Sequence, residues 1–395
     1  MKTKVVIIIE RADILLGGAE RSIMELATAL SGLGLKVDIL AAKGQTSAKN
    51  IHILCSDRGG KRTDYFTLVK TVRKYLYENK YDIIHSVLPF DFADVYQPRG
   101  GTYIQAILRN AASYQNKLIE SYKRLTAFAN WRRTILVRAE RKLCKNPDGP
   151  VIAALSNLVA GHFKEHYNVE DKRLVVIPNG IRINSRFEAG QADRLRSQIL
   201  VRLGLKEADN PVLLLFVANN FRLKGLAILI KALKTAREKY GADRAYLVIA
   251  GHGKSYKYRF MAKKLGVHKR IIFLGHIHHV RNALSITDVA VLPTFYDPSS
   301  RFILEALATG KPVITTRFNG ATDLFEHGRH GLVIDAPEDI DALAGAISHF
   351  TNTKKIETAS EAIEKDNLKE RVSIRQAAKK LQSLYESILE RKSRK

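Results

Sequence analysis

Short apolar runs alternate with stretches of helical period along most of this chain. The first run, Val5–Ile9, precedes a turn with Gly17 and Gly18, after which Ile23 and Leu30 lie on one helical face. Runs of four to six β-branched or apolar residues are typical of buried strands, and a period of 3.6 is typical of a helix packed on one side. The alternation predicts parallel sheets covered by helices.

The strands that this pattern predicts fall into two groups. The first group is Val5–Ile9, Lys36–Leu40, Ile51–Leu54, Asp82–Val87, Val151–Leu155 and Leu174–Ile177. The second group is Val212–Val217, Tyr246–Ala250, Ile271–Leu274, Val289–Leu292, Pro312–Thr315 and Gly331–Ile334. A polar stretch at 182–210 connects them. We therefore expect two doubly wound α/β domains, which bind ligands at the carboxyl ends of their strands.

One long stretch, 102–146, contains neither Gly nor Pro, so the sequence predicts no helix break there. Its apolar residues recur at helical spacing: Ile104, Ile107, Leu108, Ala111, Leu118, Tyr122, Leu125 and Ala129. Aromatic residues, among them Trp131, are distributed through it. The stretch therefore predicts an amphipathic helical segment.

In composition, the chain differs from an ordinary globular protein in its net charge. Lys and Arg number 65 and Asp and Glu number 39, a net charge of +26, while 46% apolar and 26% charged residues exclude global disorder. Two cysteines, Cys55 and Cys144, cannot form a disulfide framework and suit a reducing compartment. The longest apolar runs are too short to span a bilayer, and Val5–Ile9 is no secretory signal. The charge implies a polyanionic partner.

The positive charge is concentrated at 99–145, a stretch that contains eleven basic residues and two acidic ones. A basic amphipathic helix with aromatic residues binds an anionic headgroup layer, and this interpretation is favoured. Two alternatives stay open: the apolar stripe packs on the protein's own core beneath solvated charges, or the segment binds RNA. We expect the remaining +17, of which a basic tail at 391–395 supplies +4, to be spread along the chain.

Two cations follow the first strand of the second group directly. Arg222 and Lys224 stand after Val212–Val217, and Gly225 opens the next helix. Cations at the carboxyl end of a strand suit a diphosphate, whose charge they neutralise as the bond to it breaks. The alternative is that both are solvated loop charges.

Two carboxylates bracket a predicted helix start further along the chain. Asp297 stands in a loop after a strand, and Glu305 follows eight residues later, inside the helix. The backbone amides between them are able to hold a phosphate. Ordinary acidic residues of a first helical turn are the alternative. The phosphate-binding patterns GxGxxG and GxxxxGK[ST] do not occur, which disfavours dinucleotide and P-loop proteins.

In this order, these motifs resemble the retaining glycosyltransferases of family 4. Those enzymes typically carry Glu, seven residues, Glu and Ala, then a Gly-x-Pro-Val turn; here the residues are Asp297, Glu305 with Ala306, and Gly310–Val313. Asp therefore replaces the first Glu, which shortens its reach by one methylene. Further matches are Gly17–Glu20, Pro178–Ile181, Lys224-Gly225, Gly251–Gly253, Gly275 and Gly331–Val333. Within the family, the chain looks most like the lipopolysaccharide core glucosyltransferases.

The resemblance implies an α/β protein with the GT-B fold, in which two facing Rossmann-like doubly wound domains enclose a cleft. Residues 1–182 would form the acceptor- and membrane-facing domain, with a basic helical insertion at 99–145. Residues 183–375 would form the nucleotide-sugar domain, and 376–395 a helix that packs back toward the first domain.

The resemblance also implies a hexosyltransferase that takes a hexose from a nucleotide diphosphate sugar, UDP-glucose by expectation, with retention and with no metal or other cofactor. The catalytic residues would be Asp297, Lys224 and Arg222. Donor binding would fall to Gly17, Gly18, Ser299, Ser300, Arg301, Phe302 and Glu305. Asp94 and Arg99 would lie near the acceptor or the transferred sugar. Membrane binding would fall to Arg109, Lys123, Arg124, Trp131, Arg132, Arg133, Arg138 and Arg141.

The expected partners are therefore a nucleotide sugar, an anionic membrane surface and a lipid-linked acceptor such as a lipopolysaccharide core, with no nucleic acid. The expected location is cytoplasmic, peripheral on the inner face of the cell membrane. Two alternatives remain open: a basic nucleic-acid-binding protein on a Rossmann-like scaffold, and a GT-B sugar epimerase.

Overall fold

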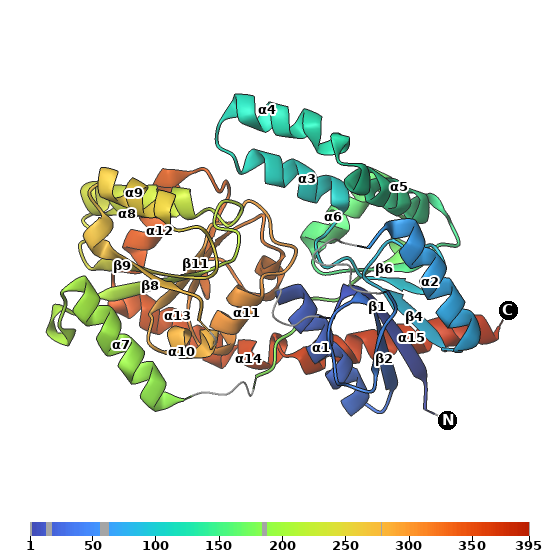
Figure 1. The fold of residues 1–395 in the computed structure, drawn as a ribbon. Helices are drawn as coiled ribbons and strands as arrows, with labels where there is room; N and C mark the ends of the chain where they lie inside the picture. The colour runs from blue at the N-terminus through green and yellow to red at the C-terminus, as the bar shows by residue number, and fades with distance from the viewer. Residues whose placement is uncertain (1, 13–17, 56–62, 184–187, 278, 395) are drawn as a thin grey trace. The chain divides into compact units, whose positions relative to one another are not determined.

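The chain folds into two compact units, each built on its own β-sheet (Figure 1). The computed structural model describes residues 2–12, 18–55, 63–183, 188–277 and 279–394. The first unit comprises Met1–Leu108, Ser121–Arg182 and Ser373–Lys395, and the second comprises Arg109–Glu120 and Ile183–Val372. The second unit thus includes a piece of the basic stretch 99–145.

The sheet of the first unit has seven strands in the order β3-β2-β1-β4-β5-β6-β7. Neighbouring strands are parallel, and β1 lies between β2 and β4. The strands are β1 Lys4–Arg11, β2 Lys36–Lys43, β3 Ile51–Ile53, β4 Ile83–Ser86, β5 Val95–Tyr96, β6 Val151–Ala154 and β7 Leu174–Val176. The winding direction reverses between β1 and β4, the arrangement of a doubly wound sheet.

The sheet of the second unit repeats this plan with six strands in the order β10-β9-β8-β11-β12-β13. The strands are β8 Val212–Val217, β9 Ala245–Ala250, β10 Ile271–Gly275, β11 Val289–Leu292, β12 Val313–Thr316 and β13 Gly331–Ile334. Here the winding reverses between β8 and β11, which pair in parallel. The crevice beside such a reversal is where doubly wound sheets bind ligands.

Helices connect the strands of both sheets. Those with residues in the first unit are α1 Gly18–Gly32, α2 Tyr65–Glu78, α3 Tyr103–Ala112, α4 Lys117–Thr126, α5 Trp131–Lys145, α6 Asn157–Tyr167 and α15 Ile374–Ser393. Those of the second unit alone are α7 Ala189–Leu203, α8 Leu226–Tyr240, α9 Tyr256–Lys264, α10 Val280–Ser285, α11 Arg301–Ala308, α12 Ile340–His349, α13 Thr353–Lys365 and α14 Leu368–Arg371. The predicted α/β class with two doubly wound sheets is confirmed.

The basic stretch is not one uninterrupted helix, so the prediction of no break is wrong. Its helices α3, α4 and α5 are separated at Gln115, which adopts a positive φ of 60°, and at Asn130. The side chain of Asn116 accepts hydrogen bonds from the amides of Leu118 and Ile119, and Asn130 accepts one from Arg133. Asparagine side chains thus cap two new helices where neither Gly nor Pro is present.

Helix α5 is anchored in the first unit by a buried carboxylate, Glu140. Its oxygens accept hydrogen bonds from the hydroxyls of Tyr96 (2.8 Å) and Tyr167 (2.7 Å) and from the amide of Tyr103 (2.8 Å). Burial raises the pKa of Glu140 to about 7, although the three donors act in the opposite direction. One side chain therefore ties α5 to β5, to α6 and to the start of α3.

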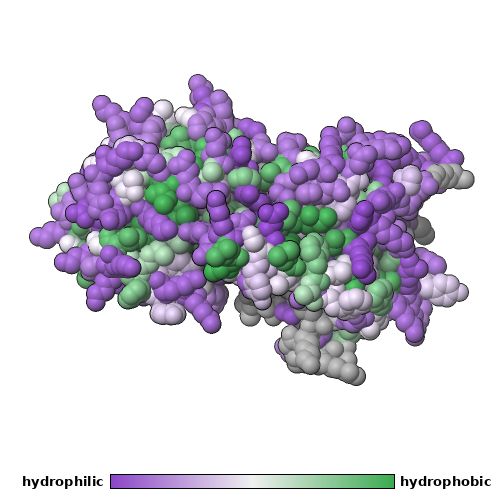
Figure 2. Space-filling model, turned by 90° about the horizontal axis from the view of Figure 1, so that it is seen from above, coloured by the Kyte–Doolittle hydropathy of each residue, from purple (hydrophilic) through white to green (hydrophobic). Residues whose placement is uncertain are grey.

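Helix α4, in contrast, buries none of its residues. Leu118, Tyr122 and Leu125 occupy one face and are 82%, 60% and 80% exposed. Hydrophilic residues cover most of the face of the molecule in Figure 2, and hydrophobic residues reach that surface in separate groups. The alternative that the apolar stripe packs on the protein's own core is wrong for α4.

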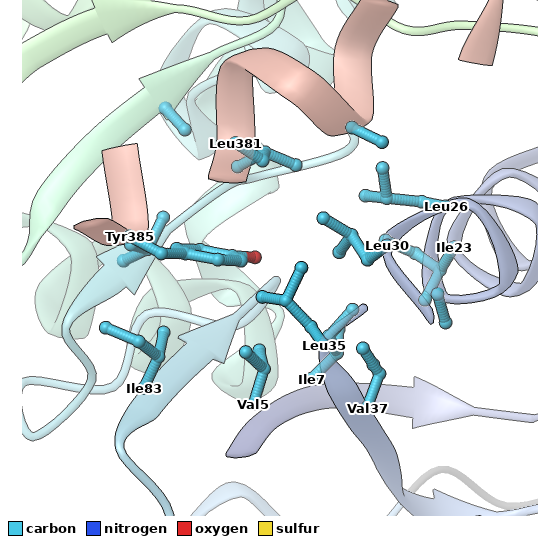
Figure 3. Close-up of a cluster of buried hydrophobic side chains, with 14 of the residues drawn as sticks. Val5, Ile7, Ile23, Leu26, Leu30, Leu35, Val37, Ile83, Leu381 and Tyr385 are labelled. Atoms are coloured by element: carbon cyan, nitrogen blue, oxygen red, sulfur yellow. The ribbon is translucent and has the colours of Figure 1, made fainter. Parts of the chain in front are cut away.

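The core of the first unit is completed by α15, the last helix along the chain. Figure 3 shows Leu381 and Tyr385 pointing toward side chains of β1 and α1, and Ala378, Leu384 and Ile388 belong to the same buried cluster. The hydroxyl of Tyr385 lies 2.6 Å from Nδ1 of His85 on β4. Burial lowers the pKa of His85 to about 3, so the ring stays neutral at physiological pH.

Candidate active site

Two loops of the second unit meet at the carboxyl edge of its sheet, where the winding reverses. One follows β8 and the other follows β11, and the amide of Phe295 donates to the carbonyl of Leu223 across them at 2.9 Å. Gly225 adopts a positive φ of 80°, and a Cβ atom there would lie 2.0 Å from the carbonyl oxygen of Pro293. Only glycine allows the loops to approach this closely.

Lys224 and Asp297 meet at this edge. Nζ of Lys224 lies 2.7 Å from Oδ2 of Asp297 and donates to the carbonyl of Tyr296 at 3.0 Å. The two side chains are 19% and 16% exposed, so the pair is shielded but remains open to solvent. The structure therefore brings together two residues that lie 73 positions apart in the sequence.

The loop that carries Asp297 is held by hydrogen bonds on both sides. The backbone of Asp297 donates to Phe318 and accepts from Gly320, and its Oδ1 accepts from the amide of Ser299 at 3.2 Å. Oδ1 of Asn319 accepts from the amides of Ser300 (3.2 Å) and Ala321 (3.1 Å). These bonds hold the start of α11 directly beside the Lys224–Asp297 pair.

The predicted donor-binding residues of this loop lie at the start of α11. Ser299, Ser300 and Phe302 are buried, and the carboxylate of Glu305 lies 3.7 Å from the guanidinium of Arg301, one turn before it. The first amides of a helix have no acceptor within the helix, and the helix dipole favours an anion there. A phosphate is the anion that such a start suits.

Arg222 is not brought together with Lys224 and Asp297. Its Nη1 donates to the carbonyl of Asn110 at 2.8 Å and to Ser113, and its guanidinium lies 3.7 Å from the ring centroid of Tyr114. Burial lowers its pKa. The catalytic role of Arg222 stays a prediction, while its observed contacts are with the segment Arg109–Glu120.

Arg109 also turns inward rather than toward solvent. Its Nε donates to the carbonyl of Phe295 at 3.0 Å, and its guanidinium lies 3.3 Å from the ring centroid of Phe318. Both partners adjoin the Asp297 loop. The contacts of Arg109 are therefore those of a residue that supports this loop, which differs from the membrane contact expected for it.

The predicted residues of the first unit have separate positions. Gly17 lies outside the described residues, and Gly18 is the first residue of α1. Asp94 accepts from the amide of Ile84 at 2.8 Å and lies 2.7 Å from Nζ of Lys392, which ties β4 to the C-terminal end of α15. The place of Asp94 near the acceptor or the transferred sugar stays a prediction.

Arg99 lies in a polar cluster between the end of β5 and the start of α3. It donates to the side chains of Ser22 and Asn179 and, at 3.0 Å, to Gln97. These residues come from α1, from the loop after β5 and from the loop after β7. Three neutral side chains thus surround the guanidinium of Arg99, a group that pairs well with carboxylate and phosphate oxygens.

The remaining residues expected to bind a membrane differ in exposure. Lys123, Arg124, Trp131, Arg133, Arg138 and Arg141 are exposed. Arg132 is not: it lies 2.7 Å from the carboxylate of Glu10 and donates to the carbonyl of Thr63 at 2.6 Å. Arg132 therefore joins α5 to the end of β1.

Two residues with a clear positioning role are not among those predicted from the sequence. Asn319 orients the start of α11, and Glu140 anchors α5. An Asn directly after a predicted strand is a signal that could have drawn attention to Asn319. For Glu140 the signal is weaker: an acidic residue at an apolar position of the helical period.

In the part of the chain that the structure describes, no three His, Cys, Asp or Glu side chains gather in a way that could hold a metal ion. Within the same part, none of the helices is both long enough and apolar enough to cross a membrane.

Comparison with known sequences gives two domain matches that together span most of the chain. The domain described as Glycosyltransferase Family 4 matches residues 16–185, and the domain described as Glycosyl transferases group 1 matches residues 202–380. The lipopolysaccharide glucosyltransferase WaaG of Escherichia coli strain K12 is 23% identical over 327 residues, which are 81% of this chain and 82% of that protein.

Comparison with solved structures identifies the same architecture. The crystal structure of WaaG, a glycosyltransferase involved in lipopolysaccharide biosynthesis, aligns with a TM-score of 0.73 at 20% identity, covering 96% of this chain and 99% of that one. HepE of Anabaena in complex with UDP-glucose aligns with a TM-score of 0.69 at 18% identity, covering 97% and 99%. At these identities the likeness shows the fold, and the GT-B fold expected from the sequence is confirmed.

Proposed function

Since this chain belongs to the glycosyltransferases in which a Family 4 domain precedes a group 1 domain, we propose that it transfers glucose from UDP-glucose to a lipid-linked acceptor of the lipopolysaccharide-core type. The observation that carries the proposal is the Lys224–Asp297 pair, which lies beside the start of α11 at the reversal of the second sheet. The sugar donor named for HepE and the glucosyl transfer named for WaaG support this choice of donor.

The donor chemistry follows from the charges at this edge. The bond between the sugar and the diphosphate breaks, and negative charge develops on the leaving oxygen. In our proposal, Lys224 and the positive end of the α11 dipole stabilise that charge, since the amides of Ser299 and Ser300 already donate to Asp297 and Asn319. Glu305 accepts hydrogen bonds from the ribose hydroxyls, and Asp297 orients the transferred sugar through its hydroxyl groups.

We further propose that the acceptor hydroxyl attacks the same face of the sugar that the diphosphate leaves and passes its proton to the leaving phosphate oxygen, so that the anomeric configuration is retained. Lys224 takes the role that a divalent cation has in other transferases, so turnover should be insensitive to EDTA. The cluster around Arg99, with Ser22 and Asn179, is proposed to hold the acceptor.

Membrane association is the second part of the proposal. Three apolar side chains of α4, those of Leu118, Tyr122 and Leu125, are exposed on one face, and Lys123 and Arg124 lie on the same short helix. An amphipathic helix of this kind lies in the headgroup layer of an anionic bilayer, where a lipid-linked acceptor is found. We therefore place the enzyme peripherally on the inner, cytoplasmic face of the cell membrane.

The experiment that tests the reaction measures release of the nucleotide diphosphate from a panel of UDP-, GDP- and ADP-sugars. UDP-glucose is expected to be the best donor. Substitution Lys224→Ala should lower kcat by about 100- to 1,000-fold, since it removes a preorganised positive charge from the leaving group. The matched control is Lys234→Ala, a partly exposed lysine on the helix that follows the same loop.

Thermal unfolding of both variants separates a loss of chemistry from a loss of folding. Turnover of Lys224→Ala at near the wild-type rate, with a normal Tm, contradicts the role of Lys224. A different preferred donor in the panel contradicts the assignment of UDP-glucose and leaves the role of Lys224 intact.

A further inference from the structure

A second stretch of the chain is as rich in positive charge as the basic stretch 99–145. Residues 244–287 contain nine Lys and Arg and neither Asp nor Glu, whereas 99–145 contains eleven basic and two acidic residues. Both stretches therefore carry +9, in 44 and 47 residues. The charge outside 99–145 is not evenly spread, which corrects the expectation from the sequence.

The centre of this second stretch is α9, a helix of the second unit. Tyr258 and Ala262 are its buried residues, and the ring of Tyr258 packs edge-on against Phe221, 5.6 Å between centroids. Tyr256 and Phe260 are 77% and 69% exposed. They stand four residues apart, so they share one helical face, opposite the buried one.

The exposed aromatic face of α9 is surrounded by positive charge. Lys263 and Lys264 follow Phe260 at three and four residues, so they lie on the same face. Both are exposed, and among the described residues neither forms an ion pair or a hydrogen bond. Arg259 and Arg270, in contrast, turn to the protein, the first over the ring of Phe273 and the second to Asp243.

We propose that α9 is a docking surface of the second unit for anionic lipid headgroups, separate from α4. Amphipathic aromatic side chains insert at the boundary between headgroups and acyl chains, and lysines beside them bind the anionic headgroups. The acid-free sequence around α9 is complementary to such a surface. The inference does not depend on the proposed reaction, because α9 contributes no residue to the Lys224–Asp297 site.

An extended lipid surface fits these residues better than a nucleic acid does. The aromatic and basic side chains lie on one exposed face of a helix, and such a face can rest on a flat layer. Single-stranded nucleic acid is held in positively charged grooves that follow its backbone. Binding to RNA is nevertheless an outcome that the experiment must be able to detect.

The test uses the full chain and vesicles of phosphatidylethanolamine with phosphatidylglycerol, with phosphatidylcholine vesicles for comparison, in a sedimentation assay. Two double variants are made: Tyr256→Ser with Phe260→Ser, and Lys263→Glu with Lys264→Glu. Each should weaken binding to the anionic vesicles by about tenfold or more. The matched control is Lys354→Glu with Lys355→Glu, adjacent exposed lysines on α13 of the same unit, which should change binding by less than about twofold.

Each outcome decides the inference. Unchanged vesicle binding of both α9 variants, with binding lost on substitution of α4, overturns the role of α9 and leaves α4 as the docking helix. Unchanged vesicle binding with weakened binding to a single-stranded RNA oligomer also overturns it and assigns α9 to nucleic acid. Loss of vesicle binding by both α9 variants, with normal Tm and normal turnover of the sugar donor, supports it whether or not UDP-glucose is the donor.

Discussion

Helices α4 and α5 belong to the same basic stretch of sequence but differ in what their side chains contact. Helix α5 buries Ile135, Leu136 and Leu143 and anchors itself through Glu140. Helix α4 buries nothing and exposes its apolar face. Both helices are basic, and α5, which packs in the core, is the more basic of the two, so positive charge does not distinguish a core helix from one whose apolar face is exposed.

This difference shows that the positively charged residues of the stretch 99–145 fall into two groups with different contacts. Arg109 and Arg132 hold parts of the protein together, whereas Lys123, Arg124 and Arg133 extend into solvent. Counting charges along the sequence therefore overestimates how many basic residues of this stretch are available to the proposed membrane surface. Substitutions that affect α4 and α5 separately test this division.

The largest expected effect is on membrane binding through α4. The triple substitution Leu118→Ser, Tyr122→Ser and Leu125→Ser should weaken binding to anionic vesicles by roughly 100-fold or more, because burying each apolar side chain contributes on the order of 1–2 kcal/mol. Sedimentation with vesicles measures it. Stability should change little, because these side chains are largely exposed.

The control for α4 is the pair Tyr77→Ser and Val201→Ser, exposed apolar residues on α2 and α7. This pair should bind vesicles as the wild type does. A substantial fall in the Tm of the triple variant would show that α4 is packed in solution, and the contrast with α5 would then fail.

The next effect is on stability through α5. Glu140→Ala leaves the hydroxyls of Tyr96 and Tyr167 and the amide of Tyr103 without their acceptor in a buried site, at a cost of about 3 kcal/mol in the free energy of unfolding. Urea unfolding measures it. Glu120→Ala, on α4, should change stability by less than about 0.5 kcal/mol, and equal effects of the two substitutions would contradict the contrast.

The pH dependence of stability should reveal the same carboxylate. The pKa of Glu140 is raised from 4.5 to about 7 in the folded protein, so between these values the folded state binds more protons than the unfolded state. Stability from this group is therefore fully present below pH 4.5 and is lost as the pH rises through about 7. Between about pH 5 and 7 the loss is on the order of 2 kcal/mol, since one pKa unit is about 1.4 kcal/mol.

The reference for this measurement is Glu140→Gln, which does not titrate. Its amide oxygen can accept from Tyr103 and Tyr167, and its NH2 group can donate to the hydroxyl of Tyr96. The difference in free energy of unfolding between wild type and variant should shift in favour of the variant as the pH rises. If this difference in free energy of unfolding stays constant from about pH 5 to 8, the pKa of Glu140 is not raised in the folded protein.

The smallest effects distinguish two neighbouring arginines of α5. Arg132→Ala should destabilise the protein by about 1 kcal/mol, because a partly buried ion pair with Glu10 is lost. Arg133→Ala should leave stability within about 0.5 kcal/mol and weaken vesicle binding a few-fold. Identical behaviour of the two variants in both assays would contradict the division of charges proposed above.

Most of the fold was predictable because its strands are short, buried and apolar. Val212–Val217 and Val289–Leu292 were predicted with the bounds that β8 and β11 have. The two-residue strand β5 was missed, since an alternation cannot be recognised in two residues. The break between α3 and α4 was missed because it depends on Asn116 as a cap rather than on Gly or Pro.

How well the sequence predicts the candidate site depends on how far apart in the chain the contacting residues are. Lys224 and Asp297 each follow a strand, so the rule for doubly wound sheets is enough to predict that both lie at one edge of the sheet. Arg222 follows the same strand as Lys224, yet its partner is Tyr114, more than a hundred residues away. Which of these two neighbouring cations pairs with Asp297 therefore depends on a contact distant in the sequence, and no local sequence pattern predicts it.

The contribution of α15 to the first core has a consequence for how the chain folds during synthesis. The first unit needs Leu381 and Tyr385, so its core is incomplete while the 190 residues Ile183–Val372 are being made. Most of the second unit is that contiguous segment, so its sheet can form before α15 has been synthesised. Because domains fold as units during translation, we expect the second unit to become protease-resistant first, and the N-terminal half to depend on chaperones until the last helix has been synthesised.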